Sequence, residues 1–286
     1  GYDVFVSDFG KIKQSYKDVL DKYGIPWEEE QHTEALILNA TVVMKSPGIP
    51  DKAPIVKKLV EKGISVISEI EFTAPFTNAI TIGITGSNGK TTTTMLTYHL
   101  LKNAGLNVAL GGNIGKSFAW QVAEHNYDVY VLELSSFQLD GIINYKPHIA
   151  ILTNISPDHL DRYEYKYENY IASKFRITMN QTASDYLIYD ADDEATQEWL
   201  KHNTTKAQLI PFSISQTLDL GAFLKDNNME VKMNQEEFSM ETEYIALEGK
   251  HNMKNAMAAT SVAKLMQIRN ATIRESLSNF QGVEHR

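Results

Sequence analysis

The stretch ITIGITGSNGKTT, residues 80–92, decides the fold of this chain. Its β-branched first half predicts a strand, and the glycines, lysine and threonines that follow are typical of a loop that binds phosphate. Loop amides and the start of the next helix would surround phosphate oxygens, with Lys90 on the outer phosphates and the Thr91 hydroxyl on Mg²⁺. The stretch therefore predicts that the protein binds a nucleoside triphosphate. The residues expected to hold it are Gly86, Ser87, Asn88, Gly89, Lys90, Thr91 and Thr92.

One position departs from the general pattern G-x-x-x-x-G-K-[ST]. The first glycine would fall at position 84, which holds Ile84, and Gly86 is the earlier glycine of the loop. An ordinary Gly-Asn-Gly turn between a strand and a helix is the alternative interpretation. The sequence of strand, loop and helix favours the phosphate loop.

Length and composition limit the class of protein. A chain of 286 residues favours two domains. The net charge of −9 argues against nucleic acid or an anionic membrane as the main partner. Cysteine is absent, which excludes disulfides, thiolate nucleophiles and cysteine-based zinc sites. With no long apolar run and no signal-like segment, the sequence predicts a soluble, cytoplasmic protein.

Short apolar runs alternate with helical patterns, which predicts an α/β fold with a mostly parallel sheet. The segment 69–78 has little periodicity and is the predicted domain boundary. We therefore expect two α/β domains, one over 1–78 and a P-loop NTPase-like one over 79–286. Strands are predicted at 4–7, 41–44, 64–67, 79–85, 107–110, 129–133, 149–153, 186–189 and 209–212, and helices at 12–23, 53–61, 91–104 and 252–266.

Polar side chains follow the predicted strands at the edge where α/β sheets bind ligands. Glu133 ends the strand 129–133, where a carboxylate would hold the Mg²⁺ of a nucleotide; a surface residue is the alternative. In the next such segment, Ser156 and Pro157 predict a helix start. They leave His159 unexplained, and its imidazole would either ligate a metal or a substrate oxygen or form an ordinary hydrogen bond.

Three further side chains are candidate site residues. Lys174 flanks the apolar stripe of a predicted helix over 170–177, so it would either be partly buried, with a lowered pKa and a nucleophilic amine, or extend to water. Asn252 and Asn255 lie one helical turn apart at a helix start, where their amides would bracket an adenine edge. The alternative is that Asn252 serves only as a helix N-cap.

Four segments together resemble the Mur ligase family, the ATP-dependent amide ligases that build the peptide of bacterial peptidoglycan. They are TGSNGKT (85–91), GGNIG (111–115), LELSSFQL (132–139) and NISPDHLDR (154–162). The first looks like the family's own phosphate loop, which accounts for Ile84. Within the family the chain resembles the D-glutamate-adding member; the alanine-adding member has a histidine in place of Asn88.

The resemblance implies a role for each matching residue. It implies ATP, two Mg²⁺ ions, UDP-N-acetylmuramoyl-L-alanine and D-glutamate as ligands, and an enzyme that acts as a monomer in cell-wall synthesis. Lys90, His159 and Lys174 would be catalytic, with a carbamate on Lys174. Thr91, Glu133, His159 and Lys174 would bind metal. Asn252, Asn255 and Arg286 would bind ATP. Asp8, Phe9, Ser46, Pro47, Gly48, Asn113, Ser135, Gln138 and His159 would contact the UDP substrate.

The ends of the chain depart from the family pattern. The family's first strand and its glycine turn are absent before Gly1, so the resemblance implies a partial Rossmann-like domain over 1–78 that binds the UDP substrate. The family's amino-acid-binding third domain would begin after Arg286. We therefore expect a truncated polypeptide that binds nucleotide without turnover. Two alternatives stay open: another amide ligase, either a different Mur ligase or a folylpolyglutamate synthetase-like enzyme, and a phosphate-loop switch without ligase activity.

Overall fold

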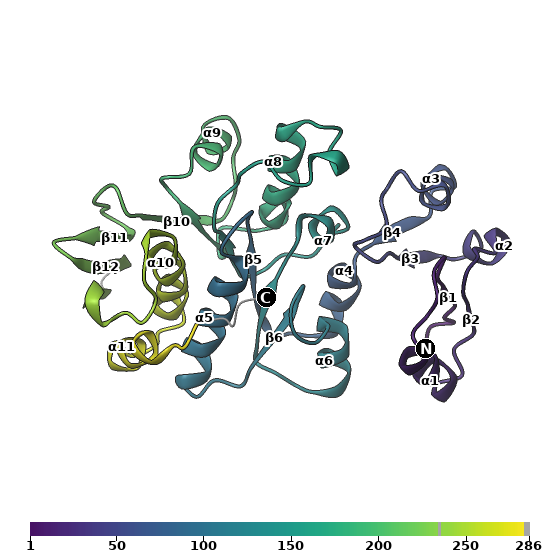
Figure 1. Cartoon of the computed structure of the whole chain (residues 1–286), viewed down its shortest axis with the longest axis horizontal. Coiled ribbons are helices and arrows are strands. Elements are labelled where there is room, and N and C mark those ends of the chain that lie inside the picture. Colours follow the sequence, from purple (N-terminus) through teal and green to yellow (C-terminus); the bar gives the residue numbers. More distant parts are fainter. Residues whose placement is uncertain (234–235, 283–286) are drawn as a thin grey trace. The chain divides into compact units, whose positions relative to one another are not determined.

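The computed structural model describes residues 1–233 and 236–282 (Figure 1). The chain divides into two compact units, Gly1–Ser68 and Glu69–Arg286. The second unit thus begins at Glu69, whereas the sequence predicted a boundary before residue 79. The segment between forms helix α4 (Glu69–Thr73) and the 3₁₀ turn η1 (Ala74–Phe76), and α4 packs on α6 (Phe118–Glu124). In the described part of the chain, no helix is long and apolar enough to cross a membrane.

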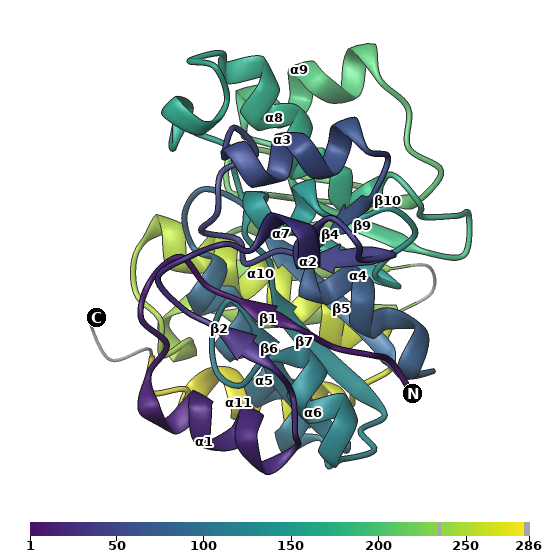
Figure 2. The same cartoon turned by 90° about the vertical axis from the view of Figure 1, so that its right-hand side faces the viewer.

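The first unit contains two short pairs of parallel strands with helices between them. Figure 2 shows β1 beside β2, with α1 following β1 along the chain. The strands β3 and β4 form the second pair. This arrangement fits the predicted partial Rossmann-like unit. Its elements are β1 (Val6–Ser7), α1 (Gln14–Lys22), β2 (Trp27–Glu28), α2 (Glu34–Ile37), β3 (Val42–Met44), α3 (Pro54–Glu61) and β4 (Ser65–Ile67).

The second unit is built on a sheet whose described strands run in the order β13-β12-β11-β10-β9-β8-β5-β7-β6. From β6 to β11 neighbouring strands pair in parallel, and β11–β13 form an antiparallel meander. This confirms the predicted mostly parallel sheet. The strands are β5 (Ile80–Thr85), β6 (Val108–Gly112), β7 (Val129–Glu133), β8 (Ile149–Leu152), β9 (Tyr186–Asp190), β10 (Gln208–Ser213), β11 (Gly221–Lys225), β12 (Asn228–Met233) and β13 (Glu236–Glu241).

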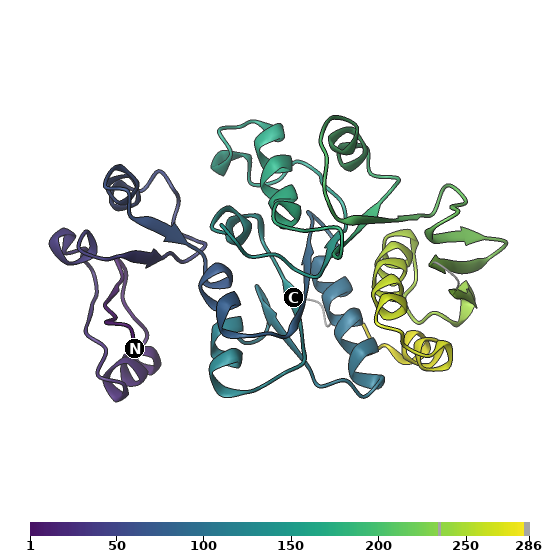
Figure 3. The ribbon, with the colours of Figure 1, turned by 180° about the vertical axis from the view of Figure 1, so that it is seen from behind.

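Helices cover both faces of this sheet. On one face, α5 lies against α10 and α11, as Figures 1 and 3 show. On the other face lie α4, α6, α7, α8 and α9. The bounds are α5 (Lys90–Asn103), α7 (Ser136–Asp140), α8 (Tyr167–Phe175), α9 (Glu194–His202), α10 (Lys250–Leu265) and α11 (Asn270–Asn279), with 3₁₀ turns η2 (Leu160–Arg162), η3 (Arg176–Thr178) and η4 (Thr242–Tyr244).

The central strands are buried on both faces, and alternate residues enter different cores. Ile82 and Ile84 of β5 belong to the core beneath α5 and α10. Between them, Gly83 faces the other core, where an added Cβ would lie 3.1 Å from the Leu134 side chain. Because side chains of a strand alternate between faces, both cores depend on this register. Ile84 is fully buried, and this explains why an apolar residue occupies the position that a strict phosphate-loop pattern gives to glycine.

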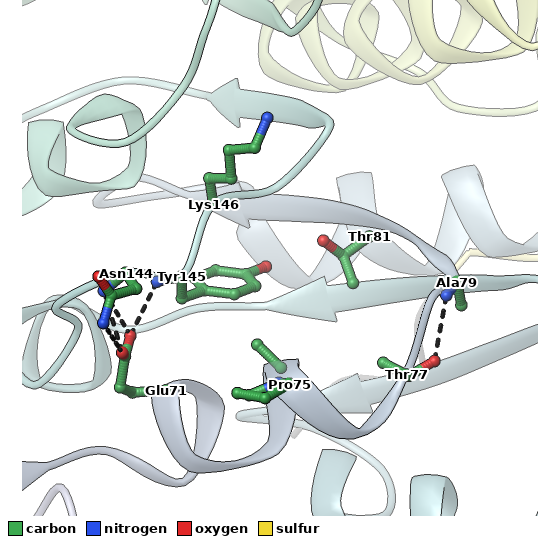
Figure 4. A pocket seen from close by; sticks show the side chains of 9 residues that line it. Glu71, Pro75, Thr77, Ala79, Thr81, Asn144, Tyr145 and Lys146 are labelled. Carbon is green, nitrogen blue, oxygen red and sulfur yellow. Dashed lines mark hydrogen bonds between the residues drawn. The ribbon is translucent and has the colours of Figure 1, made fainter.

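A buried carboxylate joins α4 to the sheet. Glu71 accepts hydrogen bonds from the backbone amides of Ile143, Asn144 and Tyr145, at 2.8–3.0 Å. Glu71, Asn144 and Tyr145 also border a cavity of about 280 Å³ at the amino ends of β5 and β8 (Figure 4). The glycine loop follows the opposite, carboxyl end of β5, so this cavity is separate from it. Three successive amides on one carboxylate fix α4 within the second unit.

We expect Glu71→Ala to lower the free energy of unfolding by about 3 kcal/mol, because it leaves three amides without their charged acceptor. Urea denaturation followed by circular dichroism measures the change. Glu275→Ala, which removes an exposed carboxylate from α11 in the same unit, is the control and should change stability by less than about 0.5 kcal/mol. Equal effects of the two substitutions would contradict this role.

Candidate nucleotide-binding site

The loop of residues 86–89 connects β5 to α5 in a conformation that requires glycine. Gly86 has φ +144°, and an added Cβ would lie 1.9 Å from the Thr153 hydroxyl. Gly89, the N-cap of α5, has φ +81°, and its Cβ would lie 2.5 Å from Asn255 Oδ1. Neighbouring groups therefore lie so close to Gly86 and Gly89 that any residue with a Cβ at either position would clash with them.

The segment after β8 holds this loop. Asn154 forms three hydrogen bonds with the loop. Its backbone carbonyl accepts from the Ser87 amide at 2.8 Å. Its side-chain Oδ1 accepts from the Asn88 amide at 3.0 Å, and its Nδ2 donates to the Asn88 carbonyl at 2.9 Å. The Thr153 hydroxyl donates to the same carbonyl at 2.6 Å. Of this segment, the sequence analysis singled out His159 as a ligand and missed Thr153 and Asn154. Their position directly after a central strand was the available signal.

Ser156 does not begin a helix, so that prediction was wrong. Its amide donates to Ser87 Oγ and its carbonyl accepts from the same hydroxyl, each at 2.9 Å. Residues 153–159 form no helix, and the backbone groups of Asn154 and Ser156 bind the glycine loop instead. Tyr170, whose hydroxyl lies 3.1 Å from Ser87 Oγ, is a further neighbour of the loop that the sequence did not reveal.

Two lysine side chains converge on one backbone carbonyl. Lys90 Nζ donates to the Gly86 carbonyl at 3.0 Å and to the Ser87 carbonyl at 2.9 Å. Lys174 Nζ donates to the Gly86 carbonyl at 2.9 Å. Lys174 is 2% exposed, so the alternative that it extends to water was wrong. The result is a compact positive site where β5 meets α5.

The same burial changes the acidity of both lysines. Burial and, to a smaller extent, the neighbouring Lys90 ammonium lower the pKa of Lys174 to about 7. Burial also lowers the pKa of Lys90, although the Glu133 and Asp158 carboxylates act in the opposite direction. Near neutral pH, Lys174 therefore has a substantial fraction of neutral, nucleophilic amine, which was one of the two alternatives that the sequence left open.

Glu133 lies between two predicted site residues. Its Oε2 accepts from the Thr91 hydroxyl at 2.7 Å, and its Oε1 accepts from Asn113 Nδ2 at 2.9 Å. The side chain is 2% exposed, so the alternative of a surface residue was wrong. A carboxylate and a hydroxyl oxygen this close form a donor set suited to Mg²⁺. The role of Thr91 and Glu133 as metal ligands stays a prediction.

His159 is less closely tied to these groups. Its side chain is 54% exposed, its Nε2 lies 3.5 Å from Asp158 Oδ2, and its ring packs 5.2 Å from that of Phe137. Its φ of +49° turns the chain sharply before η2. Among the described residues, no three His, Asp or Glu side chains form a group that would hold a metal ion. Metal or substrate binding by His159 therefore also stays a prediction.

Asn252 and Asn255 lie together in the first turns of α10. Asn255 Nδ2 donates to Asn252 Oδ1 at 3.3 Å, and Asn255 Oδ1 accepts from the Thr93 hydroxyl of α5 at 3.1 Å. Gly249 is the N-cap of α10, so the alternative that Asn252 is only an N-cap was wrong. The asparagine pair thus borders the glycine loop, on the side where α10 packs against α5.

The remaining predicted residues are distributed more widely. Ser135 and Gln138 form the capping box of α7, in which each side chain bonds the other residue's backbone amide, so both have a structural role beside any contact with substrate. Asp8, Phe9, Ser46, Pro47 and Gly48 lie in the first unit, where Asp8 Oδ1 accepts from the Gly10 amide at 2.7 Å. Thr92 lies in the first turn of α5. Arg286 lies outside the described residues.

The glycine loop, its lysines and the parallel sheet define a phosphate-loop nucleotide-binding protein of the α/β class. Two family models match the chain: the Mur ligase middle domain over residues 84–263 and the MurD N-terminal domain over residues 1–55. The chain belongs to the Mur ligase family.

Curated relatives agree with this family. The chain is 62% identical to a UDP-N-acetylmuramoylalanine–D-glutamate ligase of Christiangramia forsetii and 53% identical to one of Bacteroides thetaiotaomicron. All of this chain is covered in both comparisons, and it spans 64% of each relative's length. Among solved structures, the UDP-N-acetylmuramate:L-alanyl-gamma-D-glutamyl-meso-diaminopimelate ligase (MPL) of Neisseria meningitides has a TM-score of 0.66 at 18% identity, over 98% of this chain and 91% of that one. This last likeness shows the fold alone.

We expect Gly89→Ala to destabilise the second unit by more than Gly105→Ala. Both glycines have nearly equal φ, +81° and +83°, but only Gly89 has a neighbour within 4 Å, Asn255. Each substitution costs about 1 kcal/mol in backbone strain, and the clash at Gly89 adds at least about as much again. Thermal unfolding of both variants measures the difference.

The excess cost should disappear when Gly89→Ala is combined with Asn255→Ala, because the shorter side chain removes the clashing Oδ1. An excess that persists in the double variant would contradict the close approach of α10 to the loop.

Proposed function

We propose that the protein is an ATP-dependent ligase that joins D-glutamate to UDP-N-acetylmuramoyl-L-alanine during peptidoglycan precursor synthesis. The observation that carries the proposal is the phosphate loop with Lys90 and Lys174 at one carbonyl, in a chain 62% identical to a ligase of that name. The first unit would bind the UDP substrate and the second would bind ATP. Cytoplasmic location and a monomeric state belong to the same proposal.

The loop is suited to a triphosphate. The positive ends of the α5 backbone dipoles meet the Lys90 ammonium at the carboxyl end of β5. When phosphate oxygens arrive, Lys90 would exchange its bonds to the Gly86 and Ser87 carbonyls for charge-assisted bonds to phosphate. Asn252 and Asn255 would receive the adenine, with Arg286 near the phosphates.

The donor set beside the loop fits Mg²⁺. Thr91 and Glu133 would hold one ion, and a carbamate on Lys174 together with His159 would hold a second. These ions would offset the charge of the transferring phosphoryl group. Glu133 already has both oxygens fixed by Thr91 and Asn113, so its orientation would change little on binding. Asn113, Ser135 and Gln138 would contact the muramoyl substrate.

The proposed reaction proceeds in two transfers. A substrate carboxylate oxygen attacks the γ-phosphorus of ATP, the bond to the β-phosphate oxygen breaks, and ADP leaves. The D-glutamate amine then attacks the resulting acyl phosphate at its carbonyl carbon, the carbon–oxygen bond breaks, inorganic phosphate leaves, and the amine loses a proton. The Lys90 ammonium and loop amides would stabilise the phosphoryl group during the first transfer.

We expect the protein at its natural full length to release phosphate from ATP only when UDP-N-acetylmuramoyl-L-alanine and D-glutamate are both present. The acyl phosphate needs the first and its breakdown to product needs the second. A coupled phosphate assay measures the rate, with each substrate omitted in turn as the control. Equal release with L-lysine, meso-diaminopimelate or a glutamyl-folate would favour another ligase. Substrate-independent hydrolysis would favour a nucleotide switch.

We expect Lys174 to form a carbamate. Its neutral Nζ would attack CO₂ to form an N–C bond and release a proton, and the pKa of about 7 leaves much of this amine neutral at pH 7 and above. In ¹³C-bicarbonate, the protein should give a carbamate carbon signal in NMR that declines as the pH falls below 7, because protonation removes the reacting electron pair.

Lys174→Arg should abolish this signal. Lys264→Arg, which replaces another buried lysine of the second unit, is the matched control and should retain it. A signal that survives Lys174→Arg, or its absence from the unaltered protein between pH 6 and 9, would rule out the carbamate.

A further inference from the structure

An ion pair ties the asparagine-bearing turn of α10 to the end of β9. Lys254 lies between Asn252 and Asn255 in sequence, and its Nζ is 2.7 Å from Asp190 Oδ2 and 3.2 Å from Asp192 Oδ2. Asp190 is the last residue of β9 and is 2% exposed. One ammonium thus joins the helix to two carboxylates at the carboxyl edge of the sheet.

The two carboxylates are themselves held firmly. Asp190 Oδ1 accepts from the Asp192 amide at 2.9 Å. The Asp192 carboxylate accepts from the Ser213 and Ser215 hydroxyls at 2.5 Å and from the Ile214 amide at 2.9 Å. These donors follow or end β10, the neighbouring strand. The anchor for Lys254 is therefore connected to two strands of the sheet.

Stability does not explain this pair well. Burial raises the pKa of Asp190 above its ordinary value even though Lys254 lies beside it. Asp190 and Asp192 raise the pKa of Lys254 against the effect of the lysine's own burial, so the pair offsets part of the cost of burying Asp190. A buried ion pair of this kind adds little to the free energy of folding. Packing already holds α10, whose residues 255–264 are all buried. What the pair adds is a fixed position for the first turns of the helix.

Those turns carry the side chains that border the glycine loop. Asn255 accepts from Thr93 and donates to Asn252, and neither asparagine side chain is hydrogen-bonded to a described strand of the sheet. A small rotation of α10 about its axis would move both amides relative to Gly89, and Lys254 opposes that rotation from the adjoining positions of the helix.

We propose that Lys254, held between Asp190 and Asp192, is a positioning residue that sets the first turns of α10 so that Asn252 and Asn255 hold the purine base of the nucleotide. This inference rests on the proposed ATP binding. It assigns Lys254, Asp190 and Asp192 to selection of the base, whereas the glycine loop and Lys90 bind the phosphates that every nucleoside triphosphate shares.

The test compares two ligands by calorimetric titration of the protein at its natural full length. ATP carries a base, whereas inorganic tripolyphosphate offers the loop phosphates alone. We expect Lys254→Met to weaken ATP binding about tenfold, the net contribution of about one hydrogen bond, and to change tripolyphosphate binding by less than about twofold. Lys254→Arg keeps the charge and should restore most of the ATP affinity.

Two further variants complete the comparison. Asp190→Asn keeps the size of the carboxylate and should also weaken ATP selectively, which provides a second measurement if Lys254→Met folds poorly. Lys264→Met removes a buried lysine from the far end of α10, where it bonds Asn270, and should leave the ratio of the two affinities unchanged.

The outcomes separate this inference from the proposed function. No binding of ATP by the unaltered protein would overturn both. If the unaltered protein binds ATP but Lys254→Met and Asp190→Asn leave its affinity unchanged, or weaken both ligands equally, the positioning role alone is overturned. Selective loss of ATP affinity with rescue by Lys254→Arg supports it.

Discussion

The loop of residues 86–89 can take its form only because Gly86 and Gly89 have no side chains. The Thr153 hydroxyl occupies the space that a Cβ on Gly86 would need, and Asn255 does the same at Gly89. Through these two contacts, the end of β8 and the start of α10 reach the backbone between β5 and α5. The rest of the site depends on this approach, because it brings residues from three distant parts of the chain to one loop.

Close approach also concentrates positive charge in a chain whose net charge is −9. Lys90 and Lys174 both donate to the Gly86 carbonyl, and burial lowers the pKa of each. Lys90 stands at the N-terminus of α5, so its ammonium and the helix dipole together favour an anion, whereas Lys174 is partly neutral near pH 7. Glu133 and Thr91 stand beside this region with their own hydrogen bonds in place. A few buried groups thereby give an acidic protein a local site suited to an anion.

Apolar packing and polar contacts position the helix α10 in different ways. Its alanine-rich middle fits against α5 and the sheet, which fixes the distance of the helix from its neighbours. Apolar packing is non-directional and leaves rotation about the helix axis less strictly defined. The directional contacts of Lys254 with Asp190 and of Asn255 with Thr93 restrict this rotation next to the loop. A buried pair that contributes little to stability is consistent with such a role.

The sequence by itself determined the α/β class, the phosphate loop and most strand positions, because burial on both faces and the need for glycine leave local patterns. It also indicated Glu133, Lys174 and the asparagine pair. It wrongly placed a helix start at Ser156, and it did not show that the boundary segment 69–78 packs with the second unit, since contacts of Ser87 and Glu71 with distant segments decide these features. Only the tertiary structure brought Asn154 to the loop and Lys254 to Asp190, because hydrogen bonds and ion pairs between remote residues follow no periodicity in the chain.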